Sequence, residues 1–423
     1  MVNCPCEFKK KRKKNMKIER SFPKATVTDK AVRALKGGHP WVFADEIITI
    51  EGGYENGELV DVFSKKNRYM GTGFINDNSK IRVRIISKNA NDRFDGDFWE
   101  RRVRYALDYR KTVMGGDFNC CRLIFGEADQ FPGLTVDRFG SVIVTQCLSL
   151  GIDKIKNILF PLIVRVLREM GEEIDVLYER NDVKIREKEG MEEYKAFFEG
   201  EGLKTNTDGK TIITENGIKY NIDYINGQKT GFFLDQKYNR LAAAKIAKGR
   251  RVLDCFTHTG AFAMNCAAAG AELVTAVDVS KDAVEMTRKN AQLNGLENMS
   301  FECADVFELL TKMAAEGKCP YDYIILDPPA FTKSSATVRN AERGYKEINM
   351  KAMKLLPRGG YLATCSCSHF MRDELFRKML RSAAEDAGVE LRQIEARQQS
   401  PDHPILWNVP ETDYLKFYIF QVV

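Results

Sequence analysis

The chain has 423 residues, which exceeds one ordinary domain and suits two or three. Its 44% hydrophobic content is typical of globular proteins, and the absence of any run of about 18 apolar residues excludes a membrane-spanning protein. Residues 1–20 hold eight Lys and Arg against two acidic residues, which accounts for the net charge of +6. The rest of the chain is neutral, so charge alone does not indicate a nucleic-acid partner.

The basic N-terminus and the cysteines both indicate a cytoplasmic protein. Residues 1–20 lack the apolar segment of a secretory signal, so we expect a disordered, solvated leader. The 11 cysteines are odd in number and never form a CxxC spacing, and the four histidines are scattered. We therefore expect reduced thiols, no disulfides and no structural metal.

Residues 22–92 contain short β-rich segments between turn residues, which predicts a small β-barrel domain. Residues 93–210 combine helical and alternating segments and predict an α+β middle domain. In these two parts the expected strands cover residues 25–32, 57–64, 69–75, 80–87, 139–150 and 174–181, and the expected helices cover 98–114 and 152–170.

The last domain, residues 211–423, opens with an expected hairpin over 215–226. From about residue 230 strands and helices alternate, which predicts a Rossmann-like parallel sheet flanked by helices. The expected strands are residues 251–256, 272–279, 300–305, 321–327 and 360–366, with a helix over 281–294 that Ser280 caps. Residues 401–422 are expected to form two closing strands.

The first strand of this sheet leads into a turn with the pattern D-x-F-x-x-x-G, formed by Asp254, Phe256 and Gly260. Open α/β sheets bind ligands at the carboxyl ends of their strands, and Gly260 lets a ligand approach the backbone. The pyrophosphate pattern G-x-G-x-x-G is absent, so a dinucleotide is not expected. The turn favours a cofactor without phosphates, such as S-adenosylmethionine (SAM).

Three further carboxylates end the following strands, namely Asp278, Asp305 and Asp327. Asp278 is expected to accept hydrogen bonds from ribose hydroxyls, and Asp305 to meet the adenine amino group. One aspartate alone would be an ordinary turn or cap residue. Four at one sheet edge predict a cofactor site, because they coincide with the crevice that the fold offers.

Asp327-Pro328-Pro329-Ala330 follows the fourth strand, and its prolines stiffen a loop whose carbonyls can hold a flat ring. Cys365 and Cys367 lie at the end of the fifth strand. C5 of a pyrimidine becomes nucleophilic when a thiolate adds to C6, so this chemistry needs one cysteine that faces the methyl donor. Strand alternation places both cysteines on one face, and the spacing does not choose between them.

Several motifs make the chain resemble the bacterial 23S rRNA (cytosine-C5) methyltransferases that carry an N-terminal PUA domain. The resemblance covers about residues 24–423. It rests on Gly37-Gly38-His39-Pro40-Trp41-Val42-Phe43, on Tyr178-Glu179-Arg180, on the stretch Gly227 to Gln236, on Arg343 to Asn349 after the Asp327 loop, and on Ser366-Cys367-Ser368.

The resemblance implies a PUA-like domain, a middle domain and a class I methyltransferase sheet. It assigns the nucleophile to Cys367, with Asp327 and Pro328 beside it, and Cys365 as the alternative. It also implies SAM contacts from Ser280 and from a segment that closes the site, which includes Phe233, Asp235 and Gln236. Ala330 stands where a neighbouring group of RNA methyltransferases has a second cysteine, which implies a one-cysteine cycle.

Two other functions are weighed against this one. A guanine-N7 rRNA methyltransferase would need no nucleophilic cysteine, and a ribosome-assembly factor could bind RNA and SAM without catalysis. The expected partner is 23S rRNA or a large-subunit precursor, with no membrane. The target nucleotide, a homodimer and the base that removes the C5 proton stay open, although His369 is considered for that role.

Overall fold

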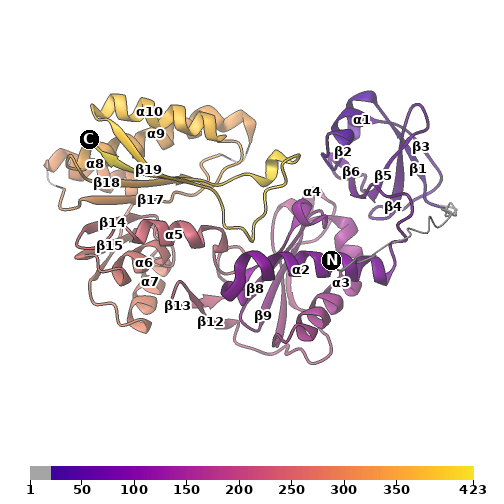
Figure 1. Ribbon diagram of the computed structural model, residues 1–423, viewed down its shortest axis with the longest axis horizontal. Coiled ribbons are helices and arrows are strands. Elements are labelled where there is room, and N and C mark those ends of the chain that lie inside the picture. The colour runs from indigo at the N-terminus through magenta and orange to yellow at the C-terminus, as the bar shows by residue number, and fades with distance from the viewer. Residues whose placement is uncertain (1–20, 318, 333) are drawn as a thin grey trace, which may run out of the picture.

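Three β-sheets and a separate hairpin organise the chain into three parts (Figure 1). The structure is a computed structural model that describes residues 21–423 except 318 and 333. The predicted leader, residues 1–20, lies outside the described residues. The three parts follow one another along the long axis of the molecule. This agrees with the predicted multidomain α/β organisation.

The N-terminal part is a six-stranded sheet with strand order β2-β6-β5-β4-β1-β3. Its strands are β1 (Lys24–Val27), β2 (Trp41–Phe43), β3 (Ile47–Glu51), β4 (Leu59–Ser64), β5 (Tyr69–Ile75) and β6 (Ile81–Ser87), with a 3₁₀ turn η1 (Ala44–Glu46). The strand expected over residues 25–32 is wrong in its second half, where helix α1 (Asp29–Lys36) begins. Thr28 caps this helix by accepting a hydrogen bond from the Ala31 amide at 3.4 Å.

The middle part is a five-stranded sheet with order β11-β10-β9-β8-β7. Two long helices, α2 (Gly96–Met114) and α3 (Leu150–Glu169), pack together and bury Trp99 and Phe160. The remaining elements are β7 (Cys120–Phe125), β8 (Leu134–Phe139), β9 (Val142–Cys147), β10 (Val176–Asn181), β11 (Tyr194–Phe197), α4 (Ile185–Lys188), η2 (Gly115–Asp117) and η3 (Gly126–Asp129). The predicted helices and strands of this part are confirmed within a few residues.

A hairpin of β12 (Lys210–Glu215) and β13 (Ile218–Asp223) joins the middle part to the last one. It begins earlier than the expected hairpin at 215–226. Tyr220 and Ile222 of this hairpin share one buried cluster with Val144 of the middle sheet. The same cluster continues to Met264 in the C-terminal part, so the hairpin connects the two cores.

The C-terminal part is a seven-stranded sheet with order β16-β15-β14-β17-β18-β20-β19, parallel except for the antiparallel β20. The strands are β14 (Arg251–Cys255), β15 (Leu273–Asp278), β16 (Met299–Cys303), β17 (Tyr323–Leu326), β18 (Tyr361–Ser366), β19 (Leu391–Arg397) and β20 (Lys416–Val422). Its helices are α5 (Lys237–Ala244), α6 (Ala261–Ala268), α7 (Lys281–Leu293), α8 (Val306–Glu316), α9 (Val338–Leu355) and α10 (Asp373–Ala387), with 3₁₀ turns η4 (Leu234–Gln236), η5 (Ser335–Thr337) and η6 (Pro410–Thr412).

The closing strands differ from the prediction. Residues 401–422 contain one strand, β20, which pairs antiparallel with β18 and with β19, and the sequence pattern did not suggest β19. The intervening residues 398–415, here called the β19–β20 loop, contain Pro401, Pro404 and Pro410. Proline cannot donate a ladder hydrogen bond, so these residues keep the segment out of the sheet. Figure 1 shows this loop, in yellow, extending from the C-terminal sheet towards the middle part.

The strand order reverses at β14, which pairs in parallel with β15 on one side and with β17 on the other. In open α/β sheets this reversal opens a crevice at the carboxyl ends of the strands, and ligands bind there. The loops after β14, β15, β17 and β18 therefore converge on one edge of the sheet. Among the described residues, no helix combines the length and apolar character needed to cross a membrane.

Candidate active site

The turn after β14 has a strained backbone. Phe256 has φ of 65° and His258 has φ of 51°, both in the left-handed region that side chains disfavour. Gly260 has φ of 84°, and a Cβ there would lie 2.4 Å from Cγ2 of Thr287. Strain of this kind gathers at functional sites, where the surrounding structure maintains it. The turn therefore presents a tight backbone cradle at the sheet edge.

Asp254 is buried beneath this cradle and supports it. Its Oδ2 accepts hydrogen bonds from Oγ1 of Thr257 at 2.6 Å and from the amide of Ala263 at 3.0 Å. Its Oδ1 has no partner among the described residues. Burial raises the pKa of Asp254 to about 7. A buried acceptor without a partner marks a place that suits a donor from a ligand.

Asp278 ends β15 beside the cradle. Its two carboxylate oxygens accept from the amides of His258 and Ser280, each at 3.0 Å. Ser280 caps α7, as predicted, by accepting from the Ala283 amide at 3.3 Å. Asp305 follows β16, is exposed, and caps α8 by accepting from two amides, those of Phe307 and Glu308. The predicted strand-end carboxylates thus come together at one edge.

Phe233 and His258 form an aromatic corner over the cradle. Their ring centroids lie 5.0 Å apart with the rings nearly perpendicular. Nζ of Lys229 lies 4.6 Å from the Phe233 ring centroid, and the Phe233 carbonyl accepts from Nη2 of Arg240 at 2.6 Å. Burial lowers the pKa of His258 to about 4, so its imidazole is neutral at pH 7. This corner offers a flat apolar wall to a ligand.

Asp327 follows β17 and accepts at Oδ1 from two donors. Nε2 of Gln236 lies 3.2 Å away and Sγ of Cys365 lies 2.9 Å away. Burial raises the pKa of Asp327. Pro328 is buried directly after it. Gln236, on the 3₁₀ turn η4, is in turn fixed by Asn239, which donates to its Oε1 at 2.6 Å.

The two cysteines have different surroundings, because β18 ends at Ser366. Cys365 lies inside the strand, is 1% exposed, and donates its thiol to Asp327 and to the Leu326 carbonyl. Cys367 lies beyond the strand and is half-buried. The pKa of Cys367 is raised to about 11, because burial and the Asp327 charge raise it more than Lys229 lowers it. Strand alternation could not separate the two, whereas the strand end does.

Asp235 links this edge to the β19–β20 loop. Its Oδ2 accepts from the Tyr414 hydroxyl at 2.6 Å, and its carbonyl accepts from the Ser400 amide at 2.8 Å. Burial raises the pKa of Asp235, but His403, Lys229 and the Tyr414 hydrogen bond outweigh burial and lower it overall. Asp235 is therefore a buried anion, and its Oδ1 has no partner in the described part of the chain.

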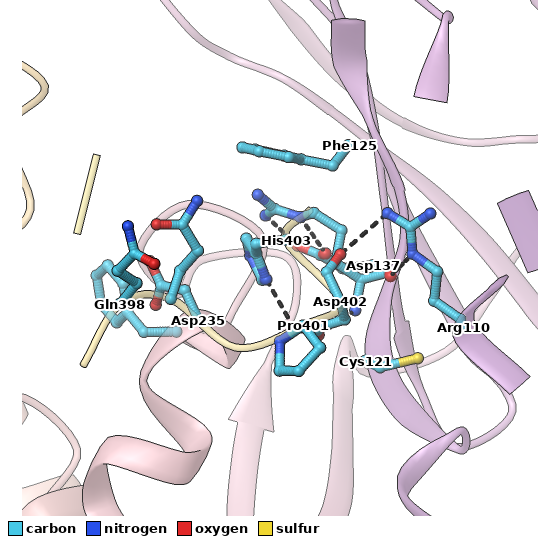
Figure 2. Close-up of polar contacts among 12 residues, drawn as sticks. Arg110, Cys121, Phe125, Asp137, Asp235, Gln398, Pro401, Asp402 and His403 are labelled. Atoms are coloured by element: carbon cyan, nitrogen blue, oxygen red, sulfur yellow. Dashed lines mark hydrogen bonds and ion pairs between the residues drawn. The ribbon is translucent and has the colours of Figure 1, made fainter. Parts of the chain in front are cut away.

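The β19–β20 loop was missed by the sequence analysis, although it packs against the site and the middle sheet. Figure 2 shows Asp402 and His403 between Asp235 on the left and Arg110 on the right, with Phe125 above them. Nδ1 of His403 lies 2.9 Å from Oδ1 of Asp402. The Asp402 carbonyl accepts from Nη2 of Arg110 at 3.0 Å. The sequence feature that could have indicated this segment is the group of prolines around His403, namely Pro401, Pro404 and Pro410.

Lys416 was also missed. It is buried at the start of β20, and its Nζ donates to the carbonyls of Ser368 at 2.6 Å and Tyr414 at 2.7 Å. Burial lowers the pKa of Lys416 to about 8. Through these two hydrogen bonds, Lys416 connects the turn after Cys367 to the β19–β20 loop. His369, on the same turn, is exposed and lies against its neighbour Phe370, with ring centroids 3.8 Å apart.

Comparison with known proteins identifies the family to which these site residues belong. A family model described as S-adenosylmethionine-dependent methyltransferase matches residues 189–417, and a model of a PUA-like domain matches residues 25–88. Ribosomal RNA large subunit methyltransferase I of Pseudoalteromonas atlantica is 40% identical over 394 residues, which are 92% of this chain and 97% of that protein. The protein of the same name from Klebsiella pneumoniae is 36% identical over 405 residues, 95% and 99% of the two chains.

A solved structure has the same fold. A protein from Streptococcus mutans, provisionally assigned as a SAM-dependent methyltransferase, superimposes with a TM-score of 0.79 at 21% identity. The match covers 94% of this chain and 100% of that chain. The arrangement of the three parts is therefore shared over nearly the whole length.

Proposed function

We propose, since the chain belongs to the family of ribosomal RNA large subunit methyltransferase I, that it methylates C5 of a cytosine in 23S rRNA or a large-subunit precursor. The protein is a SAM-dependent methyltransferase with a PUA-like domain. The observation that supports the C5 position is Cys367, a half-buried thiol just beyond β18 beside the Asp327-Pro328 loop. A cytoplasmic location follows from this substrate.

The residues at the sheet edge fit SAM. Asp278 supplies carboxylate acceptors for a ribose diol, and Gly260 lets the turn beside it pack closely against Thr287. We assign the adenine side to Ser280 and Asp305. We assign the amino-acid end to the cradle formed by Asp254 and Phe256, together with Phe233, Asp235 and Gln236. When bound, SAM supplies an electrophilic methyl group.

The chain's own residues then act on the base. The Cys367 thiolate forms a bond to C6 of the cytosine, which makes C5 nucleophilic, and C5 takes the methyl group. A base removes the proton from C5, the bond between sulfur and C6 breaks, and the thiolate is regenerated. Asp327 and the Pro328 backbone hold the ring so that the sulfur can add to C6 from one face of the ring. Cys365 does not attack, because its thiol is buried and committed to Asp327.

Mass spectrometry of 23S rRNA after incubation with deuterated-methyl SAM tests the proposal. The wild type should place the label on C5 of one cytosine, and Cys367→Ala should lose at least about a thousandfold in rate. Cys365→Ser is the matched control, since serine can still donate to Asp327, and it should retain the activity.

Label on guanine that survives Cys367→Ala would instead establish N7 methylation. Binding of SAM and rRNA without any labelled product would indicate a non-catalytic assembly factor. Either outcome would refute the C5 mechanism.

A further inference from the structure

Trp407 stands out on the surface of the β19–β20 loop, because 94% of its side chain is exposed. The backbone around it is nevertheless fixed. The Leu406 amide donates to Oγ1 of Thr412 at 2.9 Å, and the Val409 amide donates to the Leu406 carbonyl at 2.7 Å. Asn408 packs against Gly38 of the N-terminal part, where a Cβ would lie 2.4 Å from its Nδ2. The Trp407 ring is thus exposed to solvent on a turn whose backbone is fixed by hydrogen bonds.

A hollow of about 1120 Å³ begins at Trp407. It runs along the β19–β20 loop and the start of α10 to His369 and Lys416. Lys416 donates to the Ser368 carbonyl, one residue beyond Cys367, at 2.6 Å. The hollow therefore reaches from the exposed ring to the turn that carries the candidate nucleophile.

Four basic side chains and four carboxylates line the hollow, and two of the basic ones, both arginines, are exposed and can contact phosphates. Arg372, just before α10, and Arg377, on α10, line it, are exposed, and have no ion pair within 4.0 Å among the described residues. Three of the four carboxylates that line it have hydrogen-bonding partners. Asp373 accepts from the Tyr418 hydroxyl, Glu411 lies 3.3 Å from His39, and Asp413 accepts from Gln398, which leaves Glu374.

We propose that this hollow binds the single-stranded RNA next to the target nucleotide, with Trp407 stacked on an unpaired base and Arg372 and Arg377 at phosphates. The inference rests on the proposed function. A base that is modified must leave its helix, so the nucleotides beside it are unpaired near the active site. Aromatic side chains stack on such bases whatever their sequence, and exposed arginines add backbone contacts.

The test compares Trp407→Ala and Trp407→Phe with a control variant, Ile212→Ala. Ile212 is 54% exposed and lies on the β12–β13 hairpin. The dissociation constant of an unmodified 23S rRNA transcript is measured, together with kcat and KM for RNA and SAM. Trp407→Ala should weaken RNA binding about tenfold to a hundredfold and raise KM for RNA alone. Trp407→Phe should stay within a fewfold of wild type, because the ring can still stack.

Fluorescence gives a second readout. The chain has three tryptophans, Trp99 is only 2% exposed, and Nε1 of Trp41 donates to Glu127. Bound RNA should therefore quench the Trp407 emission and protect it from acrylamide. Unchanged RNA affinity in Trp407→Ala, or an equal loss in Ile212→Ala, would overturn the inference.

Two other outcomes separate the inference from the proposed function. A wild-type protein that binds the transcript without methylating it would refute the proposed function, while the Trp407 comparison would still decide the inference. A Trp407→Ala protein with normal RNA affinity that changes from dimer to monomer would assign the ring to a second copy of the chain and overturn the RNA role.

Discussion

The Cys367 thiol is protonated at neutral pH in the free protein, because burial raises its pKa to about 11. Since the thiolate is the reactive form, its reactivity should rise with pH throughout the range from 7 to 10. Lys229 opposes the effect of burial, and Asp327 and Asp235 reinforce it. The balance of these charges sets how much thiolate is available.

Lys229→Gln should therefore raise the pKa of Cys367 and slow its alkylation at pH 8. The Lys229 side chain is exposed, so solvent screening limits the effect to about twofold to tenfold. The rate of iodoacetamide labelling is followed for the Cys367 peptide by mass spectrometry across this pH range. Lys229→Arg keeps the charge and should behave as wild type. Identical pH profiles for all three proteins would show that Lys229 does not act on the thiol.

At the scale of single elements, the turn after β14 has a backbone conformation that most side chains disfavour. Gly260→Ala would place a side chain at φ of 84° and a Cβ 2.4 Å from Cγ2 of Thr287. The left-handed conformation alone costs about 1–2 kcal/mol, and the contact adds to it. We expect a lower melting temperature and at least about tenfold weaker SAM binding, measured by calorimetry. Adding Thr287→Ser, which removes Cγ2, should recover part of this loss. No recovery would show that the contact with Thr287 is unimportant.

The sequence pattern predicted most elements, because strands and helices with regular burial leave a clear period. It placed Asp254, Asp278 and Asp327 at one edge for the same reason, since parallel strands end together. It failed where one residue decides. Thr28 starts a helix inside an apparent strand, and strand alternation did not distinguish Cys365 from Cys367, although the predicted strand end at Ser366 is correct. The contacts of Lys416 and Asp402 were also out of reach, because they join segments far apart in the sequence.

At the scale of the whole molecule, the β19–β20 loop contacts all three parts. It touches the N-terminal part where His39 lies 3.3 Å from Glu411, and the middle part through Arg110 and Arg122. It touches the cofactor edge at Asp235. A segment that bonds to each part can align a surface for RNA with the catalytic edge. Its polar contacts should therefore influence both the stability of the protein and RNA binding.

Asp402 is the residue on which these contacts converge. Its Oδ2 accepts from the Arg122 amide at 2.8 Å, and its Oδ1 pairs with His403. Asp402→Ala would leave a buried amide and a buried imidazole without their acceptor, which costs about 2–4 kcal/mol. We expect a lower melting temperature in calorimetry, faster proteolysis within residues 398–415, and a higher KM for RNA. Asp413→Ala is the control on the same loop, because its contact with Gln398 is exposed, and it should change little. If the two variants melt and are cleaved alike, the loop does not couple the parts through Asp402.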